Sequence, residues 1–255
     1  YNRKPVTMDQ FRDAVFASKA ISQEIGMMAN IIENHDEPRG VSRYLPAEGQ
    51  TEQGKKLLAA ISLMSFGLPF IYQGQEIGMT NKTFRSIEYQ VALDHGYTKD
   101  KALSLIAEMS RDNARTPMQW SEEAHGGFTT GTPWLPVNEN CQTIHVKEQE
   151  SQESSVLSFY KKLIALRTDP EYEEAIVYGS QEPFLEEETN LTAFYRKGQE
   201  KTLLVLANTC SKPRTITLPT PIKKVLLNNC AAPLKTTPNR QISLQSYQLV
   251  ILETT

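Results

Sequence analysis

The segment Met27–Arg39, MMANIIENHDEPR, decides the fold. Its first half, residues 27–32, is short and mostly apolar, which predicts a strand that is buried on both faces. Its second half is densely polar and ends at a proline and an arginine. In a parallel barrel, residues at the carboxyl ends of strands carry the chemistry. The segment therefore predicts a buried strand that ends in a functional cluster, Asn34-His35-Asp36.

The neighbouring sequence repeats this pattern. Thr7 and Gln10 have the form of a capping box at the start of a helix, and Thr51 is placed to cap another. The apolar faces of these helices are predicted to be Phe11, Ala14, Val15 and Ser18 in the first, and Leu57, Ala60, Ile61 and Met64 in the second. A second apolar strand, Leu68–Tyr72, follows and runs into the polar loop Gln73–Glu76. Alternation of helix and strand indicates a parallel sheet or barrel.

Residues 80–146 do not alternate. They contain one helical segment, Lys101–Met109, and long loops, which in compact domains are usually functional. The loop residues Trp120 and Trp134 are predicted to have a core or loop-packing role rather than to stack on sugars. Helical periodicity returns at Ser155–Arg167.

The character of the sequence changes after Asp169-Pro170. Short segments rich in β-branched and aromatic residues follow, separated by turn residues. The predicted strands are Leu191–Arg196, Thr202–Ala207, Thr215–Leu218, Lys224–Leu227, Ile242–Leu244 and Tyr247–Leu252. They predict an antiparallel β-sandwich, with a domain boundary that divides the chain into residues 1–172 and 173–255.

Composition excludes several classes of function. The net charge of −3 over 255 residues gives no basic surface for nucleic acid or anionic lipid. The most apolar run, Leu57–Tyr72, is too short and too interrupted to span a membrane. Cys141, Cys210 and Cys230 are widely spaced and fit no zinc motif, which favours a reducing compartment and a cytoplasmic location. The sequence starts Tyr-Asn-Arg-Lys-Pro, without an initiator Met or an apolar signal core, and the chain is therefore expected to begin within a domain.

Several longer motifs carry a family resemblance. Asn34-His35-Asp36 with Pro38-Arg39 is followed, in order, by PFIYQGQEIGMTN at residues 69–81, RDNARTPMQW at 111–120, GFTTGTPWLPVN at 127–138 and FYKKLIALR at 159–167. Together they resemble the α-amylase superfamily of glycoside hydrolases (family 13), in its oligo-1,6-glucosidase and α-glucosidase branch. The resemblance implies the C-terminal half of a (β/α)₈ TIM barrel, from about helix six to helix eight, followed by the β-domain.

The resemblance also implies roles for individual residues. Asp36 matches the carboxylate that stabilises the transition state, and His35 matches a donor to the same sugar. Arg115 matches the arginine that reaches the non-reducing end of the terminal glucose, held by a carboxylate from the other half of the enzyme. Glu88 matches a glutamate that contacts the acceptor sugar. The alternatives are a surface turn for His35 and Asp36, a structural salt bridge for Arg115 and a solvated side chain for Glu88.

The sequence departs from the branch in three places. Residues 84–90, around Glu88, differ from the family text. Glu37 stands where the branch usually has Gln, and Glu33 stands where it usually has Asn. These changes predict different hydrogen bonding behind the motif.

The implied function is that of the C-terminal portion of a retaining, exo-acting α-glucosidase. Its substrates are expected to be the α-1,6 or α-1,4 bonds of short oligosaccharides. The nucleophile and the acid/base residue of the family precede this stretch, so the chain alone is expected to be inactive and to need the N-terminal half as its partner. No cofactor and no metal is expected.

Other readings stay open at this point. Within the family they are a sucrose isomerase, a trehalose-6-phosphate hydrolase or a dextran glucosidase. Outside catalysis they are a glucosidase-like scaffold or a sugar-binding domain.

Overall fold

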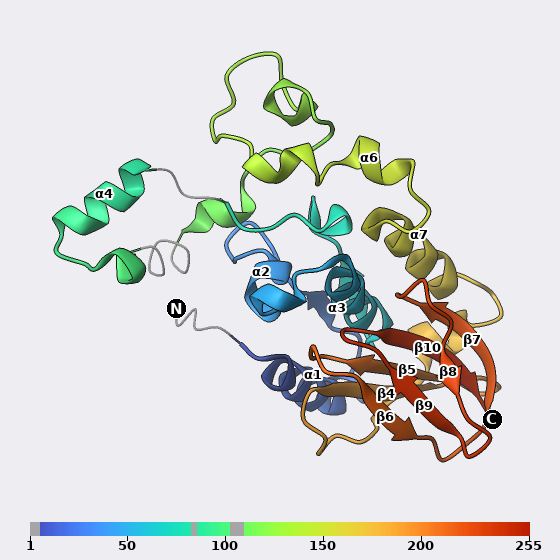
Figure 1. The fold of residues 1–255 in the computed structure, drawn as a ribbon. Coiled ribbons are helices and arrows are strands. Elements are labelled where there is room, and N and C mark those ends of the chain that lie inside the picture. Colours follow the sequence, from blue (N-terminus) through green and yellow to red (C-terminus); the bar gives the residue numbers. More distant parts are fainter. Residues whose placement is uncertain (1–5, 83–85, 103–109) are drawn as a thin grey trace.

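The computed structural model describes residues 6–82, 86–102 and 110–255. Its first part alternates helices with two short strands, and its last part is made of β-strands (Figure 1). The helices and strands are α1 Met8–Ser22, β1 Ala29–Ile31, α2 Gly40–Tyr44, α3 Glu52–Met64, β2 Leu68–Phe70, α4 Ser86–Asp94, α6 Val146–Glu150, α7 Val156–Arg167, β3 Ser180–Pro183, β4 Leu191–Lys197, β5 Thr202–Asn208, β6 Arg214–Thr217, β7 Ile222–Asn228, β8 Lys235–Thr236, β9 Gln241–Leu244 and β10 Leu249–Thr254.

The first two strands lie side by side and run in the same direction. Asn30 of β1 pairs with Pro69 of β2, and the connection between the strands contains α2 and α3. The predicted parallel pairing is therefore confirmed, although both strands are shorter than expected. Parallel pairing brings the two carboxyl ends, and the polar loops that follow them, to the same edge.

The prediction that the first strand is buried on both faces is wrong for this chain. Asn30 is buried, whereas Ile31 and, on β2, Phe70 are each 52% exposed. Side chains alternate between the two faces of a strand. Among the described residues, α1 and α3 line the side of Asn30, and the opposite face keeps its apolar side chains exposed.

The first helix has the predicted start, and Phe11 and Val15 of the predicted face are half-buried against the core, but the deeply buried face is offset from it. Thr7 and Gln10 form the capping box. The deeply buried positions include Arg12, Phe16 and Lys19, while Ala14 is exposed. The two basic side chains are buried because they have partners: Arg12 donates to the carbonyls of residues 188 and 191, and Lys19 donates to residue 30. Tertiary partners thus rotate the helix away from its apolar stripe.

The second predicted helix, α3, forms the centre of the molecule. Thr51 caps it as expected, by accepting a hydrogen bond from the Gly54 amide. Every residue from Gly54 to Met64 is buried. The helix packs against α7 on one side and against β1, β5 and β10 on others. A helix buried on all sides is expected to be apolar around most of its circumference.

The C-terminal part contains two antiparallel sheets. The order is β3-β4-β5-β10-β7 in the larger sheet and β6-β9-β8 in the smaller. The predicted strands are present within about two residues at each end, and the antiparallel arrangement is confirmed. The sequence missed β3 and β8, because Ser180–Pro183 and the two-residue β8 lack an apolar run.

Alternate residues of the larger sheet serve two different cores. On β5, Leu203 and Val205 face the helices, while Leu204 and Leu206 face the smaller sheet. The first core joins α1, α3 and α7 to the sheet, and the second fills the sandwich. The larger sheet therefore lies between the helices and the smaller sheet (Figure 1).

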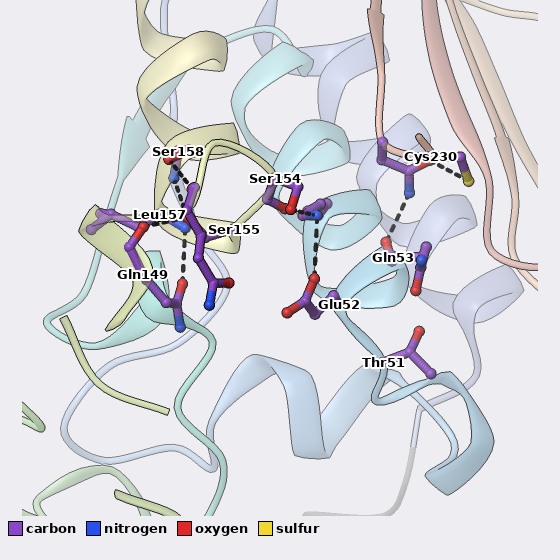
Figure 2. A network of polar contacts seen from close by, with 12 residues as sticks. Thr51, Glu52, Gln53, Gln149, Ser154, Ser155, Leu157, Ser158 and Cys230 are labelled. Atoms are coloured by element: carbon purple, nitrogen blue, oxygen red, sulfur yellow. Dashed lines mark hydrogen bonds and ion pairs between the residues drawn. The ribbon is translucent and has the colours of Figure 1, made fainter. Parts of the chain in front are cut away.

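Polar contacts also connect the β-strands to the helical part. Figure 2 shows the start of α3 beside the loop before α7 and the end of β7. The Asn229 side chain donates to the carbonyls of Gln53 and Tyr247, both at 2.8 Å, and accepts from the Leu249 amide at 2.7 Å. Lys56 of α3 donates to the Ser154 carbonyl. One buried amide therefore links β7, β10 and the α3 N-terminus.

Substituting Asn229 with alanine is expected to lower the free energy of unfolding by about 1–3 kcal/mol, because three backbone groups, two of them in buried hydrogen bonds, lose their partner. Urea unfolding measured by circular dichroism tests this. Asn239→Ala, in the exposed turn before β9, is the matched control. Equal stability of the two variants would contradict the prediction.

The remaining segment, residues 110–155, is mostly irregular and wraps one end of the molecule (Figure 1). Of the predicted helix Lys101–Met109, residues 101 and 102 are helical and residues 103–109 lie outside the described ranges. Trp120 is 50% exposed and Trp134 is 80% exposed, so neither has the core role that was one of the two predicted. An irregular segment has no periodicity from which its inward face can be inferred. No helix within the described ranges has the length and hydropathy of a membrane span.

Candidate active site

Asp36 and two arginines form an ionic cluster beyond the end of β1. The Arg115 Nη2 atom donates to Asp36 Oδ1 at 2.9 Å, and Arg111 Nε lies 3.1 Å from the same oxygen. The Asp36 side chain is 40% exposed, so the carboxylate faces solvent on one side. Hydrogen bonds between a guanidinium and a carboxylate are stronger than those between neutral groups, so Arg115 and Arg111 hold the Asp36 side chain in place.

Local backbone structure sets this geometry. After β1, the Asn34 side chain accepts a hydrogen bond from the Asp36 amide at 2.8 Å, a turn that asparagine favours. Arg115 directly follows the short 3₁₀ turn Arg111–Ala114, and its Nε donates to the His35 carbonyl at 2.8 Å. The structure therefore confirms that Asp36 and Arg115, 79 positions apart, lie together at the carboxyl edge of the parallel strands.

Of the other two predicted site residues, His35 lies in this cluster and Glu88 lies in a different part of the chain. His35 is mostly exposed, and its Nε2 lies 3.5 Å from Asp36 Oδ2, so it belongs to the same cluster. Glu88 lies in α4, which extends away from the sheets in Figure 1, and its side chain falls outside the part of the chain that the structure describes. The carboxylate that contacts Arg115 among the described residues is Asp36 itself.

Sequence reasoning missed Arg111. It lies four residues before Arg115 in the motif RDNAR. The presence of a second arginine in the same short motif was the only signal for it in the sequence. Both arginines reach the same Asp36 oxygen.

A buried layer lies behind the exposed cluster. Arg39 is completely buried, and its guanidinium donates to the carbonyls of Gln73 at 2.5 Å and Ala114 at 3.4 Å. Glu33 Oε1 lies 3.7 Å from Arg39 Nη1, and Glu33 Oε2 accepts from the Gly40 amide at 2.6 Å. Burial raises the pKa of Glu33 to about 7, although the Arg39 charge opposes the shift.

This pKa predicts how stability depends on pH. The folded pKa of about 7 is above the ordinary value of 4.5, so the folded state binds the proton more tightly. The resulting stabilisation is complete below pH 4.5 and is lost as the pH rises through 7. The Glu33→Gln variant cannot titrate there and is expected to lose this slope in urea titrations at successive pH values. The exposed Glu24→Gln is the control, and an unchanged slope in Glu33→Gln would contradict the prediction.

The arrangement presents both hydrogen-bond donors and acceptors to a polar ligand. Asp36 supplies acceptor oxygens, His35 supplies a ring nitrogen, and the two arginines supply fixed donors. The Asp36 carboxylate is able to accept hydrogen bonds from hydroxyls and to stabilise positive charge that develops nearby, whereas the arginines act only as donors.

Comparison with known proteins identifies the family. The model of the α-amylase catalytic domain matches residues 1–179. The chain is 37% identical to an oligo-1,6-glucosidase of Bacillus cereus over 235 residues, which are 86% of this chain and 41% of that protein. A mutant of a trehalulose synthase has a TM-score of 0.87 at 33% identity, and the match covers 98% of this chain and 47% of that one.

Trehalose-6-phosphate hydrolase of Bacillus licheniformis is similar to the same degree. Its crystal structure gives a TM-score of 0.87 at 30% identity, over 99% of this chain and 48% of that one. The chain thus spans less than half the length of the relatives it matches. The family match covers most of the chain and the structural similarity covers nearly all of it, so the chain belongs to the α-amylase catalytic-domain family.

Proposed function

We propose that this chain is the C-terminal portion of a retaining, exo-acting α-glucosidase that hydrolyses α-1,6 or α-1,4 bonds of short oligosaccharides. The contact between Asp36 and Arg115 carries the proposal. Asp36 binds the sugar hydroxyls and favours the oxocarbenium-like transition state, and His35 donates to the same sugar. Arg115 contacts the non-reducing end of the terminal glucose, and Glu88 contacts the acceptor sugar.

The same proposal gives the chain its place in a larger fold. Residues 1–172 form the last units of a (β/α)₈ barrel, and residues 173–255 form the terminal β-domain. The parallel pair β1 and β2 supports this, because its exposed face carries Ile31, Leu68 and Phe70, which would be buried inside a closed barrel. A groove of about 290 Å³ between α1 and β1 is lined by Phe11 and Val15 and offers another apolar surface to the N-terminal half of the same enzyme.

Three unpaired cysteines, Cys141, Cys210 and Cys230, are consistent with a cytoplasmic enzyme. No cofactor enters the proposed reaction.

The purified 255-residue chain is expected to show no turnover of 4-nitrophenyl α-glucoside, because the proposed nucleophile and acid/base residue lie in the N-terminal half. The full-length protein is the positive control. If the chain releases nitrophenol at a rate proportional to its concentration, the proposal that the nucleophile and the acid/base residue lie in the N-terminal half is wrong.

The substrate is tested with the full-length protein. The protein is incubated with isomaltose, sucrose and trehalose 6-phosphate, and the products are analysed. Isomaltose is expected to be hydrolysed, and the glucose released is expected to be the α-anomer at first, because the proposed mechanism is retaining. Isomerised sucrose or glucose 6-phosphate would instead favour the activities named for two of the similar proteins. No product from any substrate would favour a non-catalytic scaffold.

A further inference from the structure

Arg39 joins the three segments that carry the candidate site. Its backbone follows the Asp36 turn, its Nη1 donates to the carbonyl of Gln73 after β2, and its Nη2 donates to the carbonyl of Ala114. Ala114 directly precedes Arg115. The guanidinium fork of arginine holds two acceptors in a fixed geometry, which a lysine ammonium does not.

A second contact reinforces the same carbonyl. The Tyr72 hydroxyl donates to the Ala114 carbonyl at 3.0 Å, and the Arg39 guanidinium carbon lies 5.1 Å from the centre of the Tyr72 ring. Gly74 has a φ of +84°, and a Cβ there would lie 2.3 Å from the Met79 sulfur and 3.2 Å from Arg39 Nη1. The loop after β2 is therefore shaped around the arginine.

Glu33 is the acidic residue that faces this guanidinium most closely among the described residues. It approaches from the end of β1, at 3.7 Å. Three other titratable groups interact electrostatically with Glu33: Glu76 from the loop after β2, Tyr44 of α2 and Tyr160 of α7. A buried guanidinium needs a partner, because removing one member of a buried ion pair leaves an uncompensated charge.

We propose that Arg39, held by Glu33, is a positioning residue that fixes the Ala114 carbonyl and so sets Arg115 against Asp36. Neither Arg39 nor Glu33 is exposed to a ligand, so both act through Arg115. The link to catalysis depends on the function proposed above. The positional effect on Arg115 does not depend on it.

The first test measures amide hydrogen exchange in the 255-residue chain by mass spectrometry. Arg39→Lys is expected to exchange about tenfold faster in peptides covering residues 73–79 and 111–118, because the fork that joins them is lost. Glu33→Gln is expected to affect the same peptides in the same direction when exchange is measured above pH 7, where the pKa of about 7 leaves Glu33 ionised and paired with Arg39. If Arg39→Lys does not fold, Glu33→Gln alone decides the test.

Arg167→Lys is the matched control. Arg167 is also a buried arginine that donates to two backbone carbonyls, those of Leu63 at 2.8 Å and Gly67 at 2.6 Å. Its variant is expected to leave residues 111–118 as protected as in the wild type. Uniform loss of protection in Arg39→Lys, or the same pattern in the control, would overturn the proposal.

The second test is a double-mutant cycle in the full-length protein. Arg39→Lys and Arg115→Lys are each expected to lower kcat/KM, and Arg39→Lys is expected to add little once Arg115 is already replaced. Additive effects would show that Arg39 acts independently of Arg115 and would refute the positioning role. If the full-length protein has no glucosidase activity, the proposed function fails, while the exchange experiment still decides the position of Arg115.

Discussion

Replacing Asp36 with asparagine in the full-length protein is expected to lower kcat for 4-nitrophenyl α-glucoside by about 10²–10³-fold. The amide keeps the size of the side chain and one acceptor oxygen but removes the negative charge. Arg115 and Arg111, which both contact Asp36 Oδ1, would then face a neutral group. Stabilisation of an oxocarbenium-like centre depends on that charge, so kcat is affected more than KM.

The control for this experiment is Asp13→Asn. Asp13 also pairs with an arginine, Arg12, but lies on α1 and is mostly exposed. This variant makes the same chemical change and is expected to keep the wild-type kcat. An Asp36→Asn enzyme with the same kcat as Asp13→Asn would mean that Asp36 is a structural turn residue, which is the alternative that the sequence left open.

Replacing Leu57 with alanine is expected to lower the free energy of unfolding of the 255-residue chain by about 2–5 kcal/mol. Leu57 is completely buried in the core that α3 shares with α7 and the larger sheet. Closely packed surroundings on every side of the helix limit how far the structure can relax into the space left by the missing atoms. Urea unfolding followed by circular dichroism measures the loss.

Ile164→Ala is the control for the core substitution. Ile164 lies on α7, which packs against α3, but it is among the exposed hydrophobic residues. Its loss is expected to change stability much less, because its side chain is only partly removed from water on folding. Similar losses in the two variants would contradict the placement of α3 at the centre of the core.

Local sequence patterns predicted the helix caps and strands whose formation depends mainly on a few consecutive residues. The Thr7 and Thr51 caps form as expected, and the strands β4, β5 and β10 follow apolar segments that the sequence marks clearly. Capping and strand patterning need only a few consecutive residues, so they can be inferred without a structure. The two strands that were missed, β3 and β8, have no such signal and depend on pairing with a neighbour.

The candidate site likewise has features that the sequence indicates and features that only the fold creates. The motif residues Asp36 and Arg115 could be selected from the sequence because they stand in recognisable segments. Their contact, and the participation of Arg111 at 3.1 Å, depend on how a loop 75–79 residues further along the chain folds back. The sequence predicted that Arg39 supports the loop rather than contacting sugar, but its link to the Ala114 carbonyl required coordinates.

The sequence by itself determined two helix caps, the positions of α1, α3, α7 and most of the strands, the change to an all-β segment and the site candidates Asp36, His35 and Arg115. The tertiary structure decided which side of α1 is buried, since Arg12 and Lys19 find carbonyl and amide partners there. It also decided that one face of β1 is exposed and that Arg39 connects the segments behind Asp36. Caps and periodicity are properties of consecutive residues, whereas burial and long-range hydrogen bonds depend on which distant groups pack against them.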